Sequence, residues 1–132
     1  MKSFKSFLEE SQTFISGGFN IARCDMPQID DQDAFIAHIE SLGLIAMNTA
    51  IPTEVVKPTQ IEFDQSKVDK MKSSNIIGSI IVADDLYILD GHHRYFATLQ
   101  NNVKVINAYI VNVSINKLLK IAYEYLEDVG DG

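Results

Sequence analysis

The sequence predicts one α+β domain with a small mixed β-sheet flanked by helices, and three observations support this. The chain has 132 residues, enough for a single domain with its own hydrophobic core. Hydrophobic residues make up 46% and charged residues 22%, an ordinary balance for a globular protein. Along the chain, the apolar periodicities give the order α, β, α, β, β, α, β, α, in which helices and strands are interspersed.

Residues 1–16 are expected to form an amphipathic segment separate from the domain proper, 17–132. Phe4, Phe7 and Leu8 share one helical face. A Ser-Gly-Gly sequence then interrupts this pattern and separates the segment from the domain.

The first helix of the domain is predicted to begin at Asp30 or Asp31 and to run to about Leu42. Either aspartate can accept a hydrogen bond as the N-cap, and Gly43 suits the left-handed conformation that ends many helices. The residues before it, 19–29, are expected to be irregular or extended because Pro27 disfavours helix in the preceding residue.

Short extended pieces are expected at 44–47 and 54–56. A second helix begins at Asp64, with Val68 and Met71 at helical spacing.

Two β-rich runs, 79–82 and 86–89, are joined by an Ala-Asp-Asp sequence and predict a hairpin. The chain then turns at Asp90 and Gly91 into a third helix. An Asn-Asn pair at 101–102 suits its left-handed exit.

The last predicted strand is 104–113 and the last helix is about 116–127. Leu118, Leu119 and Ala122 are its expected inward residues. Residues 129–132 are predicted to be a frayed tail.

Charge and composition exclude several classes of protein. The net charge of −7 opposes general binding to DNA, because such binding depends on Lys and Arg displacing counterions. Cys24 is the only cysteine, so no internal disulfide can form, and a reducing cytoplasm is the expected compartment. The apolar runs are too short to span a bilayer, so we expect no membrane partner.

The segment Asp90-Gly91-His92-His93-Arg94-Tyr95 is the predicted functional centre. At a strand-to-helix junction, the unpaired N–H groups and positive dipole end of the helix form an anion site. Gly91 permits close approach of a ligand, and Arg94 suits phosphate oxygens. His92 and His93 can donate to phosphate or act as acid or base. Asp90 can orient a histidine, accept a proton or bind Mg²⁺.

Structural and metal interpretations of these residues are the alternatives. Asp90 taken alone fits a helix N-cap, His92 a packed core residue and Arg94 a surface salt-bridge partner. Zinc is disfavoured because adjacent histidines seldom converge on one ion, and His38 is distant in the sequence.

The run Tyr87-Ile88-Leu89-Asp90-Gly91-His92-His93-Arg94-Tyr95 resembles the hallmark segment of the ParB/sulfiredoxin superfamily, particularly its short bacteriophage members. The resemblance extends from about Ala50 to Val113 and implies that fold. Asp64–Val68 is similar to the superfamily's short helix, and Lys57–Gln60 to the ParB box that contains proline and glutamine. A further segment, Arg23–Ile29, also resembles a segment of the phage proteins.

The superfamily's branches imply different activities. Sulfiredoxins carry a cysteine where this chain has His92, which excludes their sulfur chemistry, whereas His93 and Arg94 match their phosphate-contacting pair. ParB proteins bind and hydrolyse CTP through an arginine-rich box, and this chain has one arginine there. Free serine kinases resemble the motif most closely. That resemblance implies catalysis by Asp90 and His93 and phosphate binding by Arg94.

The first ten residues, MKSFKSFLEE, resemble the targeting peptides of internal head proteins in contractile-tailed phages. The resemblance implies cleavage after Glu10. It implies location in the cytoplasm of an infected bacterium, with packaging inside the phage head. The same residues also fit a simple amphipathic starting helix.

These features support three functional hypotheses. The first is a nucleotide-binding phosphotransferase or phosphohydrolase that uses ATP, ADP or CTP with Mg²⁺, and the oligomeric state stays open. The second is a ParB-like DNA-binding protein or nuclease. The third is a non-catalytic protein of the virion interior. Residues outside the central motif that are candidates for the site are Lys57, Thr59, Gln60, Glu54 and Glu62.

Overall fold

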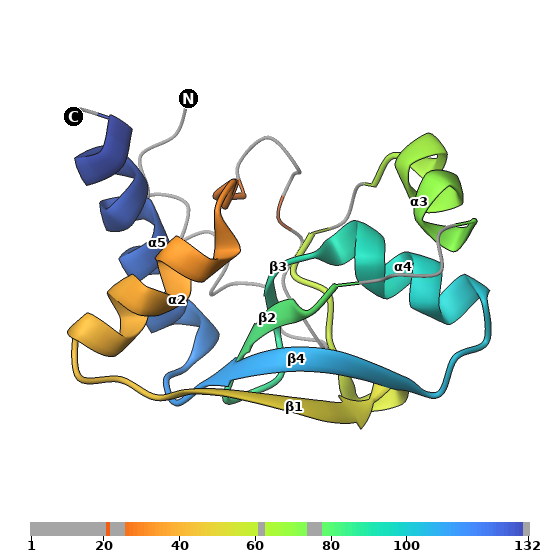
Figure 1. The fold of residues 1–132 in the computed structure, drawn as a ribbon, viewed down its shortest axis with the longest axis horizontal. Coiled ribbons are helices and arrows are strands. Elements are labelled where there is room, and N and C mark those ends of the chain that lie inside the picture. The colour runs from red at the N-terminus through yellow and green to blue at the C-terminus, as the bar shows by residue number, and fades with distance from the viewer. Residues whose placement is uncertain (1–20, 22–25, 61–62, 74–77, 131–132) are drawn as a thin grey trace.

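Four strands form the centre of the fold, in the spatial order β1-β4-β2-β3 (Figure 1). In this computed structural model, β1 (Ala46–Pro52) runs antiparallel to β4 (Val105–Val111). β4 lies parallel to β2 (Ile80–Ala83), which pairs antiparallel with β3 (Ile88–Asp90). The sheet is therefore mixed, as the sequence predicts.

The structure describes residues 21, 26–60, 63–73 and 78–130. The predicted N-terminal segment, the cleavage site after Glu10, Cys24 and Glu62 lie outside these residues. Within them the α-helices are α2 (Gln32–Ser41), α3 (Gln65–Lys72), α4 (His92–Gln100) and α5 (Ile115–Gly130). No described helix is long and apolar enough to traverse a lipid bilayer.

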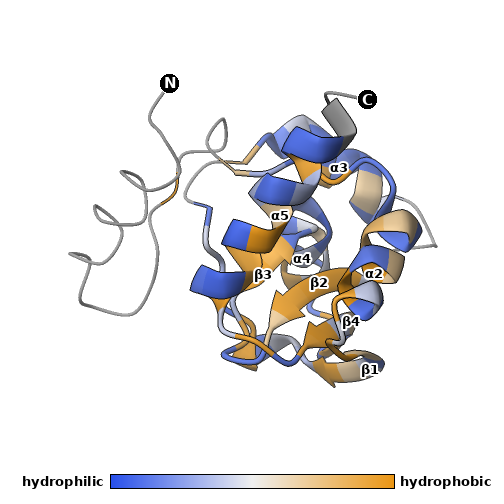
Figure 2. Cartoon of the chain, turned by 90° about the vertical axis from the view of Figure 1, so that its left-hand side faces the viewer, coloured by the Kyte–Doolittle hydropathy of each residue, from blue (hydrophilic) through white to orange (hydrophobic). Residues whose placement is uncertain are grey.

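The two faces of the sheet carry separate hydrophobic clusters, because side chains alternate along each strand. One face packs against α2 and α5, and its buried residues include Phe35, Ile39, Ile81, Leu89, Leu118 and Leu119. The other face packs against α4, and its buried residues include Ile80, Val82, Ile88, Tyr95 and Ile106. Figure 2 shows hydrophobic residues concentrated on the strands and on the inward sides of the helices. Figure 1 shows α2 beside α5 at one end of the molecule and α3 beside α4 at the other.

Several local predictions are confirmed. Asp31 caps α2 by accepting from the Ala34 N–H at 3.1 Å, and Asp64 caps α3 by accepting from the Ser66 N–H at 2.9 Å. Gly43, with φ 83°, and Asn102, with φ 57°, adopt the left-handed conformation expected after α2 and α4.

Of the two extended pieces predicted at 44–47 and 54–56, only residues 46 and 47 lie in a strand, and the second piece is wrong. One strand, β1, covers Ala46–Pro52 because β4 offers it a paired residue at every position. Thr53–Val55 instead form a 3-10 turn, in which the Thr53 hydroxyl donates to the Val103 carbonyl at 2.9 Å.

The hairpin and the C-terminal end also differ from the sequence prediction. β3 starts at Ile88, two residues late, because Leu86 has φ 69° and belongs to the turn. The predicted tail at 129–132 is wrong for its first two residues. α5 continues to Gly130, since each residue added to an existing helix gains a backbone hydrogen bond.

Residues 57–60 lie along the free side of β3. The Lys57 N–H donates to the Leu86 carbonyl and the Ile88 N–H to the Lys57 carbonyl, both at 2.9 Å. The Thr59 hydroxyl donates to the Ile88 carbonyl at 2.6 Å. These bonds extend the sheet by a short irregular segment, which reaches the start of α4.

Gly91 makes the turn from β3 into α4 sterically possible. Its φ is 99°, and a Cβ at this position would lie 2.6 Å from Cγ2 of Ile80 on β2. The close approach that glycine permits here is therefore to the strand next to β3.

We expect Gly91→Ala to destabilise the fold more than Gly43→Ala. Both positions have positive φ, which costs an alanine about 1–2 kcal/mol. A Cβ at Gly43 meets nothing within 4 Å, whereas one at Gly91 overlaps Ile80 and should cost roughly 1–3 kcal/mol more. Urea denaturation of the two variants measures this difference, and equal losses of stability would contradict it.

Candidate functional site

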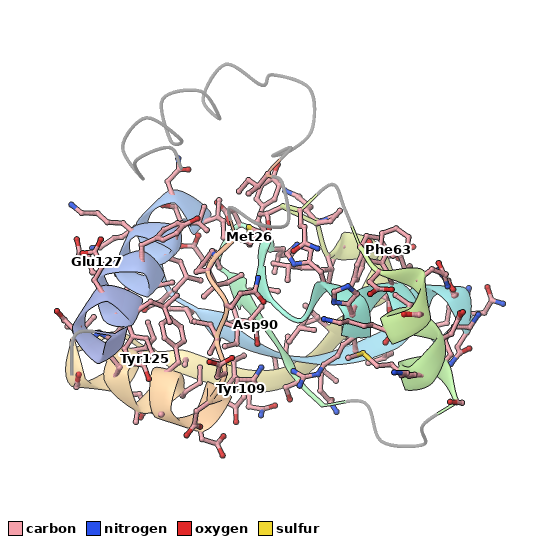
Figure 3. The ribbon with its side chains drawn as sticks, turned by 90° about the horizontal axis from the view of Figure 1, so that it is seen from above. Met26, Phe63, Asp90, Tyr109, Tyr125 and Glu127 are labelled. Carbon is pink, nitrogen blue, oxygen red and sulfur yellow. The ribbon has the colours of Figure 1, made fainter. Side chains whose placement is uncertain are left out.

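A cavity of about 160 Å3 opens where α4 begins. We call it the Asp90 cavity. Its lining residues come from the segment before α2, from residues around α3 and from the β3–α4 junction: Met26, Pro27, Gln28, Ile29, Gln60, Met71, Leu89, Asp90, Gly91, His92, His93 and Arg94. In Figure 3, Asp90 lies near the middle of the molecule. The structure thus brings together all five predicted residues from Asp90 to Arg94.

The first turn of α4 faces this cavity. Gly91 is the N-cap and offers no side-chain cap, and intrahelical bonding begins with the Tyr95 N–H on the Gly91 carbonyl at 3.0 Å. The helix itself therefore supplies no acceptor to the N–H groups of its first turn. These groups and the positive end of the helix dipole favour an anion in the cavity.

His92 is 4% exposed, and its Nε2 atom binds backbone. Nε2 accepts the N–H groups of Thr59 and Gln60, each at 3.1 Å. An atom that accepts two N–H bonds carries no proton, so the neutral ring is protonated on Nδ1. Burial and the neighbouring His93 lower the pKa of His92 to about 3. This imidazole stays neutral at physiological pH and holds residues 59 and 60 against α4.

His93 makes a related contact one residue further along. Its Nε2 accepts the Asp64 N–H at 3.0 Å, so the proton of the neutral ring is again on Nδ1. The two histidines together attach both ends of the segment 59–64 to α4. Any proton transfer by His93 in this arrangement has to pass through Nδ1.

Asp90 belongs to a hydrogen-bonded group that includes α2. Gln32 Nε2 donates to Asp90 Oδ2 at 3.2 Å and to the Ser79 carbonyl at 2.9 Å. Arg94 Nη1 donates to the same carbonyl at 2.9 Å. Gln32 therefore orients the carboxylate, and the shared carbonyl orients the guanidinium beside it.

The pKa of Asp90 is raised above its ordinary value. Burial is the main cause, and the charge of Asp30 adds to it. The charge of Arg94 and the hydrogen bonds from Gln32 and Gly91 act in the opposite direction and offset part of the rise. The carboxylate is consequently a better proton acceptor than one in water.

The other candidate residues are placed less uniformly. Gln60 lines the Asp90 cavity, whereas Thr59 is fully buried and bonds to β3. Lys57 is exposed, with Nζ 5.0 Å from the centre of the Tyr87 ring, and does not line the cavity. Glu54 borders a different cavity, beside Lys104, and Glu62 lies outside the described residues.

Sequence reasoning missed Gln32 and the wall formed by residues 26–29 and Met71. Residues 26–29 carried a signal, because they end the segment resembling the phage proteins. Gln32 carried none, since a glutamine in the first turn of a helix is ordinary and its partner is 58 positions away.

Asp90 is the only carboxylate that lines the cavity within the described part of the chain. Those residues contain no group of three or more His, Cys, Asp or Glu that could hold a metal ion. Mg²⁺ commonly binds one or two protein carboxylates together with substrate phosphates and water. The site therefore fits Mg²⁺ that arrives with a phosphate ligand, and Asp90 would be its ligand from the protein.

No protein-family model and no curated protein matches this chain. Among solved structures it is similar to the Pnob8-like ParB N-domain, with TM-score 0.52 and 16% identity over 63% of this chain and 36% of that one. Sulfiredoxin from Arabidopsis thaliana has TM-score 0.48 and 24% identity, over 57% of this chain and 96% of sulfiredoxin. ParB from Caulobacter crescentus, complexed with CTP-gamma-S, has TM-score 0.48 and 15% identity, over 64% of this chain and 53% of that ParB chain.

The chain thus spans about a third of the first of these proteins and about half of the third. The likeness to the ParB N-domain shows the fold, which confirms the predicted ParB/sulfiredoxin-like α+β class.

We expect His92 to make stability depend on pH. Its ring is neutral in the folded chain down to about pH 3 but takes up a proton near pH 6.5 when unfolded. Its contribution to stability is therefore complete above pH 6.5 and is lost as the pH falls toward 3, by up to about 1.4 kcal/mol per pH unit.

His92→Gln removes the titrating group and leaves an oxygen that can accept an N–H. The free energy of unfolding, measured by denaturant titration from pH 7 to pH 4, should fall less steeply in this variant than in the original chain. Parallel curves would show that His92 is not held neutral by the fold.

Proposed function

We propose that this protein binds a nucleotide by its terminal phosphate in the Asp90 cavity and transfers that phosphoryl group to a hydroxyl or to water. The observation that carries the proposal is the meeting of three groups in one small cavity. They are the first turn of α4, the Arg94 guanidinium and the Asp90 carboxyl.

The anion-binding half of the proposal rests on α4 and Arg94. First-turn N–H groups and a guanidinium are the donors that phosphate oxygens bind best. Arg94 Nη1 is oriented by Ser79, so the fork is held in place before a ligand arrives. Preorganised donors stabilise charge in a transition state without further rearrangement.

The chemical half rests on Asp90. Its raised pKa suits it to accept the proton of an attacking hydroxyl or water while the phosphoryl group leaves the nucleotide. Mg²⁺, when bound, neutralises charge on the phosphates. Gln32 keeps Oδ2 of Asp90 in place. His92 and His93 position the cavity wall through their bonds to backbone.

The chain's charge favours a small nucleotide over DNA as the ligand. A net charge of −7 repels a polyanion, whereas one phosphate group needs only the local field of α4 and Arg94.

We expect ATP, ADP or CTP with Mg²⁺ to raise the melting temperature of the protein. Arg94→Ala should abolish the shift, because it removes the guanidinium from the cavity. Lys57→Ala is the matched control, since it removes the same charge from outside the cavity and should keep the shift. Absence of a shift with every nucleotide, or equal loss in both variants, would contradict the proposal.

Turnover is expected to depend on Asp90 more than binding does. Asp90→Asn retains the shape of the side chain but can neither accept the proton nor offer Mg²⁺ a carboxylate. It should therefore keep a thermal shift with nucleotide added without Mg²⁺ and lose phosphate release or transfer followed by phosphorus NMR. Nicking of plasmid DNA that is lost in Asp90→Asn, without nucleotide turnover, would favour a nuclease instead.

A further inference from the structure

Phe63 presents an exposed aromatic ring one residue before Asp64, which bonds to the cavity residue His93. Its side chain is 39% exposed, although phenylalanine is among the residues most often buried. One face of the ring is stacked on Phe96, with ring centres 4.3 Å apart and planes inclined by 24°. The stack holds the ring in a defined orientation while part of it stays open to solvent.

The ring is tied to the cavity through two connections. Phe63 precedes Asp64, whose N–H donates to Nε2 of His93, a residue that lines the cavity. Phe96 lies on α4 only four residues beyond His92, a rise of about 6 Å along the helix. Figure 3 shows Phe63 next to α3, displaced from Asp90 toward that end of the molecule.

The size of the cavity requires such a surface if the ligand is a nucleotide. At about 160 Å3 it is smaller than the roughly 300–1,000 Å3 of pockets that enclose drug-sized ligands. A phosphate group fits inside, so the base has to lie beyond the rim. An aromatic face is the general means by which proteins hold a base without reading its hydrogen-bonding edge.

We propose that the Phe63–Phe96 stack is the platform for the nucleobase, with the ring of Phe63 against the base and the phosphates in the Asp90 cavity. The inference rests on the proposed function and extends it. The preferred ligand carries an aromatic base, and discrimination between bases is weak because every base has a face that can stack.

The test compares ATP with tripolyphosphate, which carries phosphates but no base, both with Mg²⁺. Calorimetry should show that Phe63→Ala weakens ATP binding by about tenfold or more, within the range for loss of one stacking contact. Tripolyphosphate binding should stay within twofold of the original. Leu99→Ala is the matched control, because Leu99 is an apolar residue on α4 that is also 39% exposed. This substitution should change the affinity for neither ligand.

A second variant gives a direct signal from the ring. The chain has no tryptophan, so Phe63→Trp introduces a single indole fluorophore. ATP should quench it by stacking and tripolyphosphate should not, and ATP affinity should match that of the original chain.

Equal weakening of both ligands by Phe63→Ala, no weakening of either, or an unquenched indole would overturn the platform while leaving phosphate binding intact. A dimer that dissociates in Phe63→Ala with ATP binding unchanged would assign the ring to a contact between chains instead. Failure of the original chain to bind either ligand would overturn the proposed function as well.

Discussion

The wall of the Asp90 cavity depends on the hydrogen bonds that the neutral imidazole of His92 accepts from the backbone. Its Nε2 atom accepts the backbone N–H groups of Thr59 and Gln60, and the Thr59 hydroxyl is bonded to Ile88 of β3. Protonation would turn an acceptor into a donor facing two donors, in a place with almost no access to water. The wall of the Asp90 cavity therefore stays in position only while this ring is uncharged. In the motif Asp-Gly-His-His-Arg, the first histidine acts through structure.

The residues of the central motif have two kinds of role: some hold the fold, and the others line the Asp90 cavity. Gly91 is required by its positive φ and by its contact with Ile80, and His92 by its backbone partners. Asp90 and Arg94 line the cavity. Gln32 bonds to the Asp90 carboxylate, and Gln32 and Arg94 both donate to the Ser79 carbonyl. Gly91 and His92 thus fix the backbone that carries Asp90 and Arg94.

The Asp90 cavity has mixed charge, which the proposed ligand has to match. The first turn of α4 and Arg94 attract an anion, while Asp90 repels one unless it is protonated or bound to a cation. Burial raises the pKa of Asp90 and so lessens this conflict. In the proposed reaction, the carboxylate receives a proton from the attacking hydroxyl or water instead of facing phosphate oxygens, which removes the conflict. Outside the cavity, the Phe63–Phe96 stack is the surface proposed for the base of that ligand.

The sequence by itself determined the α+β class and the order of the elements, and it predicted a site at Asp90–Arg94. Apolar periodicity, helix caps and a glycine after a strand are local signals, and each acts within a few residues. Only the tertiary structure decided that β1 is one strand, because its pairing with β4 crosses more than fifty residues. It also decided that Gln32 holds Asp90, that residues 26–29 form a wall, and that Lys57 and Glu54 lie elsewhere. Hydrogen bonds between distant residues leave no periodic trace in the chain, so these roles appear only once the sheet has brought the partners together.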